Sequence, residues 1–222
     1  MRRSEVVSAL VSRRLMAIVR LPHAHDLIGL VQALQSGGVD VLEFSMTTPD
    51  ALGSLAAAVG RFQGDVLLGA GTVLDAATAC AAITAGARFI VSPTLNGEVI
   101  ETAHRYGVAV IPGAMSPTEV LRACELGSDL VKVFPADILG PDYVRALAGP
   151  LAQARLVAVG GIHLGNVQAF LRAGAVAVGA GSSLVKEDDV IFERYEEVAA
   201  RARAWVAAVS DATGAAVQGG GP

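Results

Sequence analysis

Three ionisable residues lie within or at the end of short apolar runs, where burial would change their chemistry. Lys132 lies in the middle of "DLVKVF", Glu43 lies near the end of "VDVLEF", and Arg20 ends "LMAIVR". A desolvated lysine close to other cations has a lowered pKa, and its neutral amine attacks carbonyl carbons to form a Schiff base. The sequence therefore indicates that Lys132 is a catalytic amine.

Glu43 and Arg20 suit the two other tasks that such an amine requires. A carboxylate close to the amine can act as a general acid–base, and the forked guanidinium of Arg20 suits a substrate carboxylate or phosphate. Burial and Arg20 should lower the pKa of Lys132, while Glu43 acts against that shift. Structural interpretations stay open: Lys132 could reach solvent or pair with Glu43, and Glu43 could simply neutralise Lys132 or Arg20.

Two glycine-containing loops near the end of the chain indicate a phosphate site. Gly160 and Gly161 lie in "VGGI", and Gly181 and Ser182 lie in "GAGSS". Glycines let backbone N–H groups approach an anion, and barrel enzymes often bind phosphate at the loops after their last two strands. The alternative is that both loops are only tight turns.

The elements that must position these residues are visible as short apolar runs. Most of the runs are continuously apolar instead of alternating, which is typical of strands that are covered on both faces in a parallel sheet. Eight can be counted: "LMAIVR" (15–20), "VDVLEF" (39–44), "VLLGAG" (66–71), "ARFIVS" (87–92), "VAVIPG" (108–113), "DLVKVF" (129–134), "LVAVG" (156–160) and "AVAVGAG" (175–181).

Helix-length segments separate these runs, and several begin at a capping residue and end at glycine. Such start and stop signals define 75–86, 116–127 and 166–174. Eight strand–helix units predict an α/β fold, a (β/α)₈ TIM barrel with an extra N-terminal helix, although an open doubly wound sheet is the alternative. We expect one barrel domain over 1–210 and a flexible C-terminal tail over 211–222. In either fold, function should collect at the carboxyl ends of the strands.

Composition excludes several classes of function. The net charge of −4 offers no basic surface for nucleic acid. The apolar runs are too short for a membrane span, and Glu5, Arg13 and Arg14 interrupt any signal-peptide core. The four histidines and two cysteines show no zinc-binding spacing, and a lysine-based mechanism needs no metal. We therefore expect a cytoplasmic protein without metal or cofactor, and with no nucleic acid or membrane partner.

The segments at the expected strand ends resemble those of the 2-keto-3-deoxy-6-phosphogluconate aldolases, the KHG/KDPG aldolase family. The resemblance covers about residues 8–205. It rests on "AIVR", "VLEFSMTTP", "LLGAGTVL", "FIVSPTLN", "VIPGAMSPTE", "VKVFPAD", "VAVGGI" and "VGAGSSLV", in the family's order.

This resemblance implies a class I aldolase on a (β/α)₈ barrel, usually a homotrimer. Its substrate would be a phosphorylated keto-deoxy sugar acid, 2-dehydro-3-deoxy-6-phosphogluconate, cleaved to pyruvate and glyceraldehyde 3-phosphate. Lys132 matches the Schiff-base lysine and Glu43 the acid–base glutamate. Thr72 matches a residue that binds the pyruvyl carboxylate, and Pro93 a proline that lines the site. The residues that match the phosphate loops are Gly160, Gly161, Gly181 and Ser182.

One position departs from the family's commoner pattern. Many members carry an arginine four residues after the glutamate, where this chain has Thr47. Other members, including galactonate-type aldolases, carry an arginine at the end of the first strand, the place of Arg20. The anion clamp is therefore expected at Arg20, and the C4 epimer of the substrate, gluconate or galactonate, stays open.

Two other functions are compatible with the same loops. A sugar-phosphate epimerase or isomerase would share the phosphate loops, but it needs no lysine in a strand beside a glutamate. A non-catalytic sugar-phosphate-binding regulator would need neither residue.

Overall fold

The computed structural model of the chain describes residues 1–23 and 27–214, and within them it contains nine parallel strands and ten helices. The strands are β1 (Leu15–Val19), β2 (Val41–Ser45), β3 (Leu67–Gly71), β4 (Phe89–Val91), β5 (Ala109–Ile111), β6 (Gly113–Ala114), β7 (Val131–Val133), β8 (Leu156–Val159) and β9 (Ala177–Ala180). The helices are α1 (Arg3–Arg13), α2 (Ile28–Ser36), α3 (Ala51–Phe62), α4 (Ala76–Thr84), α5 (Gly97–Arg105), α6 (Pro117–Glu125), α7 (Ala136–Ala148), α8 (Val167–Arg172), α9 (Glu187–Ile191) and α10 (Tyr195–Gly214).

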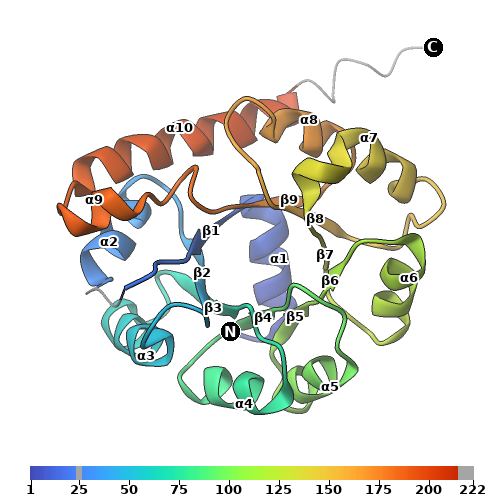
Figure 1. The fold of residues 1–222 in the computed structure, drawn as a ribbon, viewed down its shortest axis with the longest axis horizontal. Helices are drawn as coiled ribbons and strands as arrows, with labels where there is room; N and C mark the ends of the chain where they lie inside the picture. Colours follow the sequence, from blue (N-terminus) through green and yellow to red (C-terminus); the bar gives the residue numbers. More distant parts are fainter. Residues whose placement is uncertain (24–26, 215–222) are drawn as a thin grey trace.

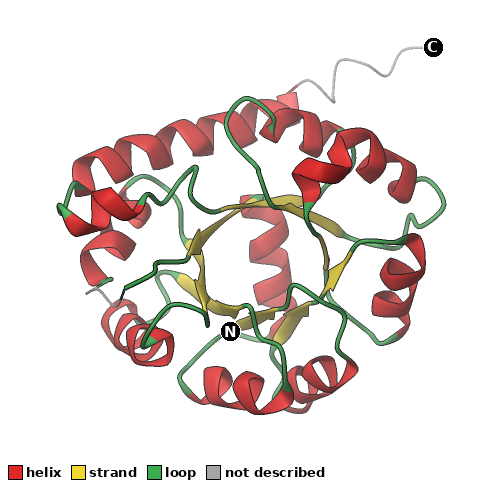
Figure 2. Cartoon of the chain, viewed as in Figure 1, coloured by secondary structure: helices red, strands yellow, loops and turns green. Residues whose placement is uncertain are grey.

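The strands form a barrel that closes through the chain itself. Their order is β5-β4-β3-β2-β1-β9-β8-β7-β6, and the two end strands, β5 and β6, are separated in sequence only by Pro112. Proline has no N–H to donate, so the fifth predicted run appears as two short strands. The carbonyl of Pro112 nevertheless accepts a hydrogen bond from the Lys132 N–H at 2.9 Å. The (β/α)₈ prediction is confirmed, and the doubly wound alternative is wrong (Figures 1 and 2).

Alternate residues of each strand face two separate apolar layers. The outer layer, between the barrel and the surrounding helices, includes Val131 and Val133 on either side of Lys132. The inner layer includes Met16, Ile18 and other inward-facing residues of the strands. The period of two in a strand therefore turns Lys132 toward the barrel axis while its neighbours pack outward.

Helix α1 closes the end of the barrel where the strands begin. Its Val6, Val7 and Leu10 are buried in the inner apolar layer, and the ribbon shows α1 lying across the barrel opening (Figure 1). Arg3 pairs with Asp129 just before β7 at 2.9 Å. Because this end is filled, the open end is the one where the strands finish.

The predicted helix starts are largely as expected, with one informative difference. Asp75 and Ser116 cap α4 and α6 through their side chains. Asn166 precedes α8 but does not cap it with its side chain. Its amide bonds instead to the preceding loop, donating to the Gly161 carbonyl at 3.0 Å and accepting from the His163 N–H at 2.9 Å.

The C-terminal helix α10 extends past the predicted domain limit at residue 210 and ends at Gly214. The rest of the predicted tail, 215–222, lies outside the described residues. Across the part of the chain that is described, no helix has the length and apolar character needed to cross a membrane.

Candidate active site

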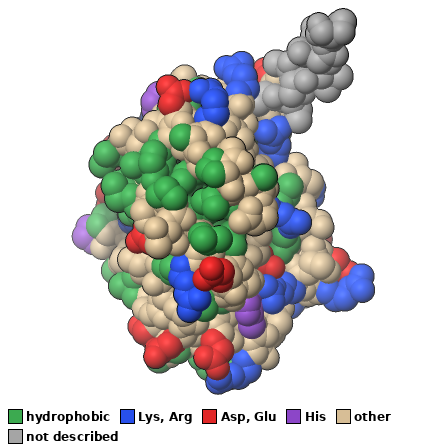
Figure 3. Space-filling view, turned by 90° about the vertical axis from the view of Figure 1, so that its right-hand side faces the viewer, with side chains coloured by type: hydrophobic (Ala, Val, Ile, Leu, Met, Phe, Trp, Pro, Cys, Tyr) green, Lys and Arg blue, Asp and Glu red, His purple; other side chains and the backbone are tan. Residues whose placement is uncertain are grey.

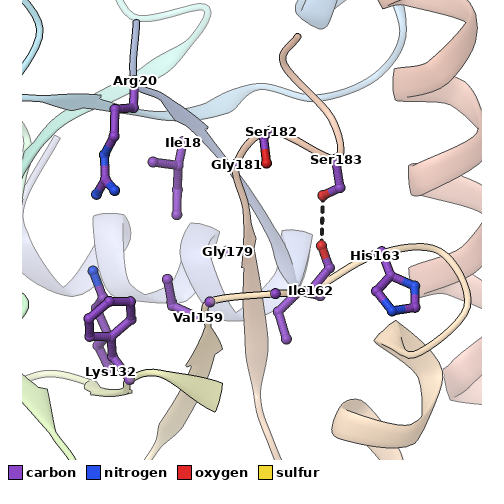
Figure 4. Close-up of a pocket in the computed structure, with 13 residues that line it drawn as sticks. Ile18, Arg20, Lys132, Val159, Ile162, His163, Gly179, Gly181, Ser182 and Ser183 are labelled. Carbon is purple, nitrogen blue, oxygen red and sulfur yellow. Dashed lines mark hydrogen bonds between the residues drawn. The ribbon is translucent and has the colours of Figure 1, made fainter. Parts of the chain in front are cut away.

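A cavity of about 370 Å³ opens at the carboxyl ends of the strands. Its volume is within the range of roughly 300–1,000 Å³ that is usual for small-molecule sites. The lining comes from β1, β7, β8 and β9 and the loops that follow them: Ile18, Arg20, Lys132, Phe134, Val159, Gly160, Gly161, Ile162, His163, Gly179, Gly181, Ser182 and Ser183. The cavity thus brings Lys132, Arg20 and both predicted phosphate loops to one space (Figure 4).

Lys132 projects into this cavity from β7 and is only 2% exposed. Its ammonium nitrogen lies 4.9 Å from the centre of the Phe134 ring. Burial lowers the pKa of the Lys132 amine; the Glu43 carboxylate opposes this shift, and the Arg20 guanidinium adds to it. The side chain therefore has the lowered pKa that a nucleophilic amine requires.

Glu43 on β2 is completely buried, and burial raises the pKa of its carboxyl group against the opposing effects of Lys132 and Arg20. Within the described part of the chain, neither of its carboxyl oxygens has a hydrogen-bond partner. Among the described residues, the salt bridges lie elsewhere, so the structure does not show the direct pairing of Glu43 with Lys132 or Arg20 that the sequence left open. A side-chain carbon at Gly71 would collide with Glu43, so the glycine makes room for this carboxyl group.

A cluster of hydroxyl groups lies beside Arg20. The hydroxyl of Ser45, which is fully buried at the end of β2, is 2.8 Å from that of Thr47 and 2.9 Å from that of Thr72. Arg20 donates longer hydrogen bonds to Ser45 at 3.4 Å and to Thr72 at 3.5 Å. Thr72 has a φ of +58°, which is uncommon for a β-branched residue and frequent at functional sites. One cation and three hydroxyls can bind a carboxylate.

The two predicted phosphate loops lie at the opposite side of the cavity. In Figure 4 the Lys132 amine and the Arg20 guanidinium point toward each other, and Ser182 and Ser183 lie across from them. Gly160 and Gly161 have φ angles of +101° and +61°, so this turn favours glycine. The Ser183 hydroxyl donates to the Ile162 carbonyl at 2.6 Å and joins the two loops.

Comparison with known proteins identifies the family. The family model for "KDPG and KHG aldolase" matches residues 6–201. The chain belongs to the KDPG and KHG aldolase family. It is therefore a lyase, and the resemblance inferred from the sequence is confirmed.

Individual relatives of this aldolase carry more specific names. The 2-dehydro-3-deoxy-phosphogluconate aldolase of Treponema pallidum is 38% identical over 196 residues, which are 88% of this chain and 93% of that protein. The 2-dehydro-3-deoxy-6-phosphogalactonate aldolase of Escherichia coli is 33% identical over 88% of this chain and 96% of its own. A crystal structure of KDPG aldolase from Legionella pneumophila, with pyruvate captured as a covalent carbinolamine intermediate, matches with a TM-score of 0.83 and 26% identity over 90% of this chain and 97% of that chain.

Not every predicted residue of this aldolase lines the cavity. Glu43 and Thr72 are not among the described residues that form the lining; they lie next to Gly71 and Arg20 respectively. Pro93 follows β4 and is not among the described residues that form the lining; a side chain on Gly113 would collide with its carbonyl group. Its predicted place in the wall stays a prediction.

Four polar residues in or beside the cavity were not among the predicted site residues: Ser45, His163, Asn166 and Ser183. Ser45 has a signal that could have revealed it, because it follows Glu43 by two residues in the same strand and so faces the same side. Ser183 directly follows Ser182 in "GAGSS", and His163 follows "GGI". Asn166 could not be found from sequence, because its type and position predict a helix cap.

The part of the chain that the structure describes contains no group of three or more His, Cys, Asp or Glu side chains that could hold a metal ion. The polar groups at the cavity are an amine, a guanidinium, the imidazole of His163, hydroxyls and backbone amides. This set suits an organic anion.

Proposed function

We propose that this aldolase cleaves 2-dehydro-3-deoxy-6-phosphogluconate, or its C4 epimer, to pyruvate and glyceraldehyde 3-phosphate through a Schiff base on Lys132. The observation that carries the proposal is the buried Lys132 amine, whose pKa is lowered in a cavity that also holds Arg20 and two glycine loops. A neutral amine at this depth can attack a ketone that the cavity admits.

The chemistry runs through one covalent intermediate. The Lys132 amine adds to the C2 carbonyl carbon, and loss of water gives a protonated imine. Glu43, acting through a water, takes the proton of the C4 hydroxyl, and the C3–C4 bond breaks. Its electron pair forms the C2–C3 double bond of an enamine, while the π pair of the imine moves to nitrogen. Glyceraldehyde 3-phosphate leaves. Glu43 then returns the proton to C3 of the enamine, and hydrolysis of the resulting imine releases pyruvate and the free amine.

The raised pKa of Glu43 suits both of its proposed steps. A carboxyl group whose pKa lies closer to the working pH both accepts and returns a proton more readily than an exposed glutamate. Burial is the main cause of this shift. Gly71 allows the burial, because a larger residue there would displace the carboxyl group.

The two charged ends of the substrate fit the two sides of the cavity. The C1 carboxylate would bind to Arg20 with Thr72, and the 6-phosphate would bind to the backbone amides at Gly160, Gly161 and Gly181 and the hydroxyl of Ser182. Since these groups lie across the cavity from each other, an extended six-carbon acid would place its C2 carbon beside Lys132.

The proposal includes assembly into a homotrimer in the cytoplasm. Exposed apolar side chains occur on α6, on α7 and just before α6, including Met115, Leu121 and Ile138. Figure 3, which turns the right-hand side of Figure 1 toward the viewer, shows apolar side chains gathered on one face. A contiguous exposed apolar face favours contact between copies of a chain.

Reduction with borohydride in the presence of pyruvate tests the chemistry. The chain has only two lysines, Lys132 and Lys186, so the site of modification can be assigned without ambiguity. We expect a stable pyruvate adduct on Lys132, which persists in Lys186→Arg and is absent from Lys132→Arg. An unmodified wild-type protein would refute the imine mechanism and favour a barrel enzyme that handles sugar phosphates without a covalent step.

A further inference from the structure

A second set of buried charges lies outside the cavity, behind the last loop. Asp189 in α9 is 1% exposed and pairs with two arginines. Arg201 of α10 bonds one carboxylate oxygen through Nη2, and Arg194 bonds the other through Nε at 3.1 Å. The proposed chemistry uses none of these three residues.

Arg201 connects this network to the loop that follows β9. Its Nε donates to the Leu184 carbonyl at 2.7 Å, while its Nη2 holds Asp189. The Leu184 and Val185 N–H groups both bond back to the Gly181 carbonyl at 2.9 Å. A single guanidinium therefore fixes the outer end of the turn that carries Gly181 and Ser182.

The same contacts reach the second phosphate loop. Ser183, the residue before Leu184, donates its hydroxyl proton to the Ile162 carbonyl and so ties the two loops together. The loop after β8 is held from its other side by the bond from the Asn166 amide to the Gly161 carbonyl. Both loops are thus fixed by side chains that lie behind them.

We propose that Arg201, held by Asp189, is a positioning residue that fixes the geometry of the phosphate loops. The inference rests on the proposed function. Backbone amides bind an anion strongly when they already point at it. None of the binding free energy is then spent on ordering the loop. A buried ion network is a costly way to join two helices, since desolvation offsets most of the attraction. The hydrogen bond from Arg201 to the Leu184 carbonyl gives this buried ion network a role in holding the loop.

Arg201→Lys tests this role while it keeps a cation beside Asp189. An ammonium lacks the fork that reaches both the carboxylate and the Leu184 carbonyl. We expect kcat/KM for the 6-phosphorylated substrate to fall about tenfold to a hundredfold, the scale on which a misplacement of roughly 1 Å acts. The value for the non-phosphorylated keto-deoxy acid should change little, so the ratio of the two falls.

Arg194→Lys is the matched control. Arg194 contacts the same carboxylate, but its side chain is 41% exposed and packs against the Phe192 ring instead of the phosphate loop. We expect this variant to keep the wild-type ratio of kcat/KM values. Exchange of the pyruvate methyl protons in heavy water, which involves no phosphate, should be unchanged in both variants.

The outcomes separate the alternatives. If Arg201→Lys lowers kcat/KM for both substrates and the rate of proton exchange by the same factor, Arg201 only stabilises the fold and the inference is wrong. It is also wrong if both arginine variants lower the ratio to the same extent, or if neither does. Should Arg201→Lys fail to fold, Asp189→Asn leaves the bond to Leu184 in place, and a smaller fall in the same ratio is then required. Failure of wild-type protein to trap pyruvate would refute the proposed function separately.

Discussion

The two sets of buried charges in this aldolase are arranged in opposite ways. In the network behind the last loop, both oxygens of Asp189 are paired with arginines. In the barrel, Glu43 is equally buried, yet among the described residues neither of its oxygens has a hydrogen-bond partner, and Lys132 forms no ion pair with any of them. The pKa values of Glu43 and Lys132 are shifted toward their neutral forms.

This difference shows how the same fold uses burial for two purposes. A paired buried charge fixes position, because breaking the pair would leave a charge without compensation. An unpaired buried amine or carboxyl group is poised to lose or gain a proton, which is what covalent and acid–base chemistry require. Leaving Lys132 and Glu43 unpaired therefore makes them reactive but lowers the stability of the fold. Pairing Asp189 with arginines holds the loop in place and leaves the carboxylate unreactive.

The largest expected effect is on the unpaired amine. Lys132→Met should abolish cleavage, a loss of several orders of magnitude, because no other group forms the imine. The measurement is pyruvate release coupled to lactate dehydrogenase, with Lys186→Arg as a control that removes the other lysine. Turnover close to that of wild type in Lys132→Met would show that Lys132 is no nucleophile.

The same variant gives a pH-dependent stability difference whose sign follows from the lowered pKa of Lys132. Between its lowered folded value and the ordinary value near 10.5, the unfolded chain holds a proton on this lysine that the folded protein lacks. Wild-type stability therefore rises with pH in this window. Lys132→Met lacks that gain, and its Glu43 also loses a favourable charge, so the Tm of the variant relative to wild type should fall as pH rises.

Glu43→Gln should have the next largest effect. The amide keeps the shape of the side chain but cannot carry a proton between C4 and C3, and general acid–base groups contribute about 10²–10⁴-fold. Borohydride trapping of pyruvate should continue at a reduced rate, while exchange of the pyruvate methyl protons, followed by NMR in heavy water, should fall by that factor. An unchanged exchange rate would show that Glu43 does not transfer the proton.

The barrel side of the comparison was predictable from sequence, and the paired network was not. Alternation within "DLVKVF" turns Lys132 inward because Val131 and Val133 must pack outward, and the closed barrel brings it to Glu43 without any further information. The bond from Arg201 to Leu184 joins residues 17 positions apart through side-chain reach, which no periodicity encodes. Asn166 has the residue type and position of a helix cap. Its side chain nevertheless bonds to Gly161 and His163 in the preceding loop and not to the first turn of α8, a choice that depends on the conformation of the loop.

The smallest effect concerns Arg20, which is exposed at the cavity mouth and so belongs to neither arrangement. Its bonds to Ser45 and Thr72 are long, at 3.4 and 3.5 Å, so it is free to give its stronger interactions to a ligand. Thr47, the position at which the resemblance led us to look for an arginine, offers only a hydroxyl, which already bonds to Ser45. Arg20→Ala should therefore raise the KM for pyruvate in the condensation direction by roughly tenfold to a hundredfold, the equivalent of a charge-assisted contact of about 1.5–3 kcal/mol. Arg20→Lys should recover only part of this loss, since an ammonium cannot bind a carboxylate in two places.

If Arg20 served only to balance the charge of Glu43, the alanine variant would instead shift the pH profile of kcat or lower Tm while the KM for pyruvate stayed constant. Measuring KM, the pH profile and Tm for both variants decides whether this cation acts on the substrate or on the buried carboxyl group.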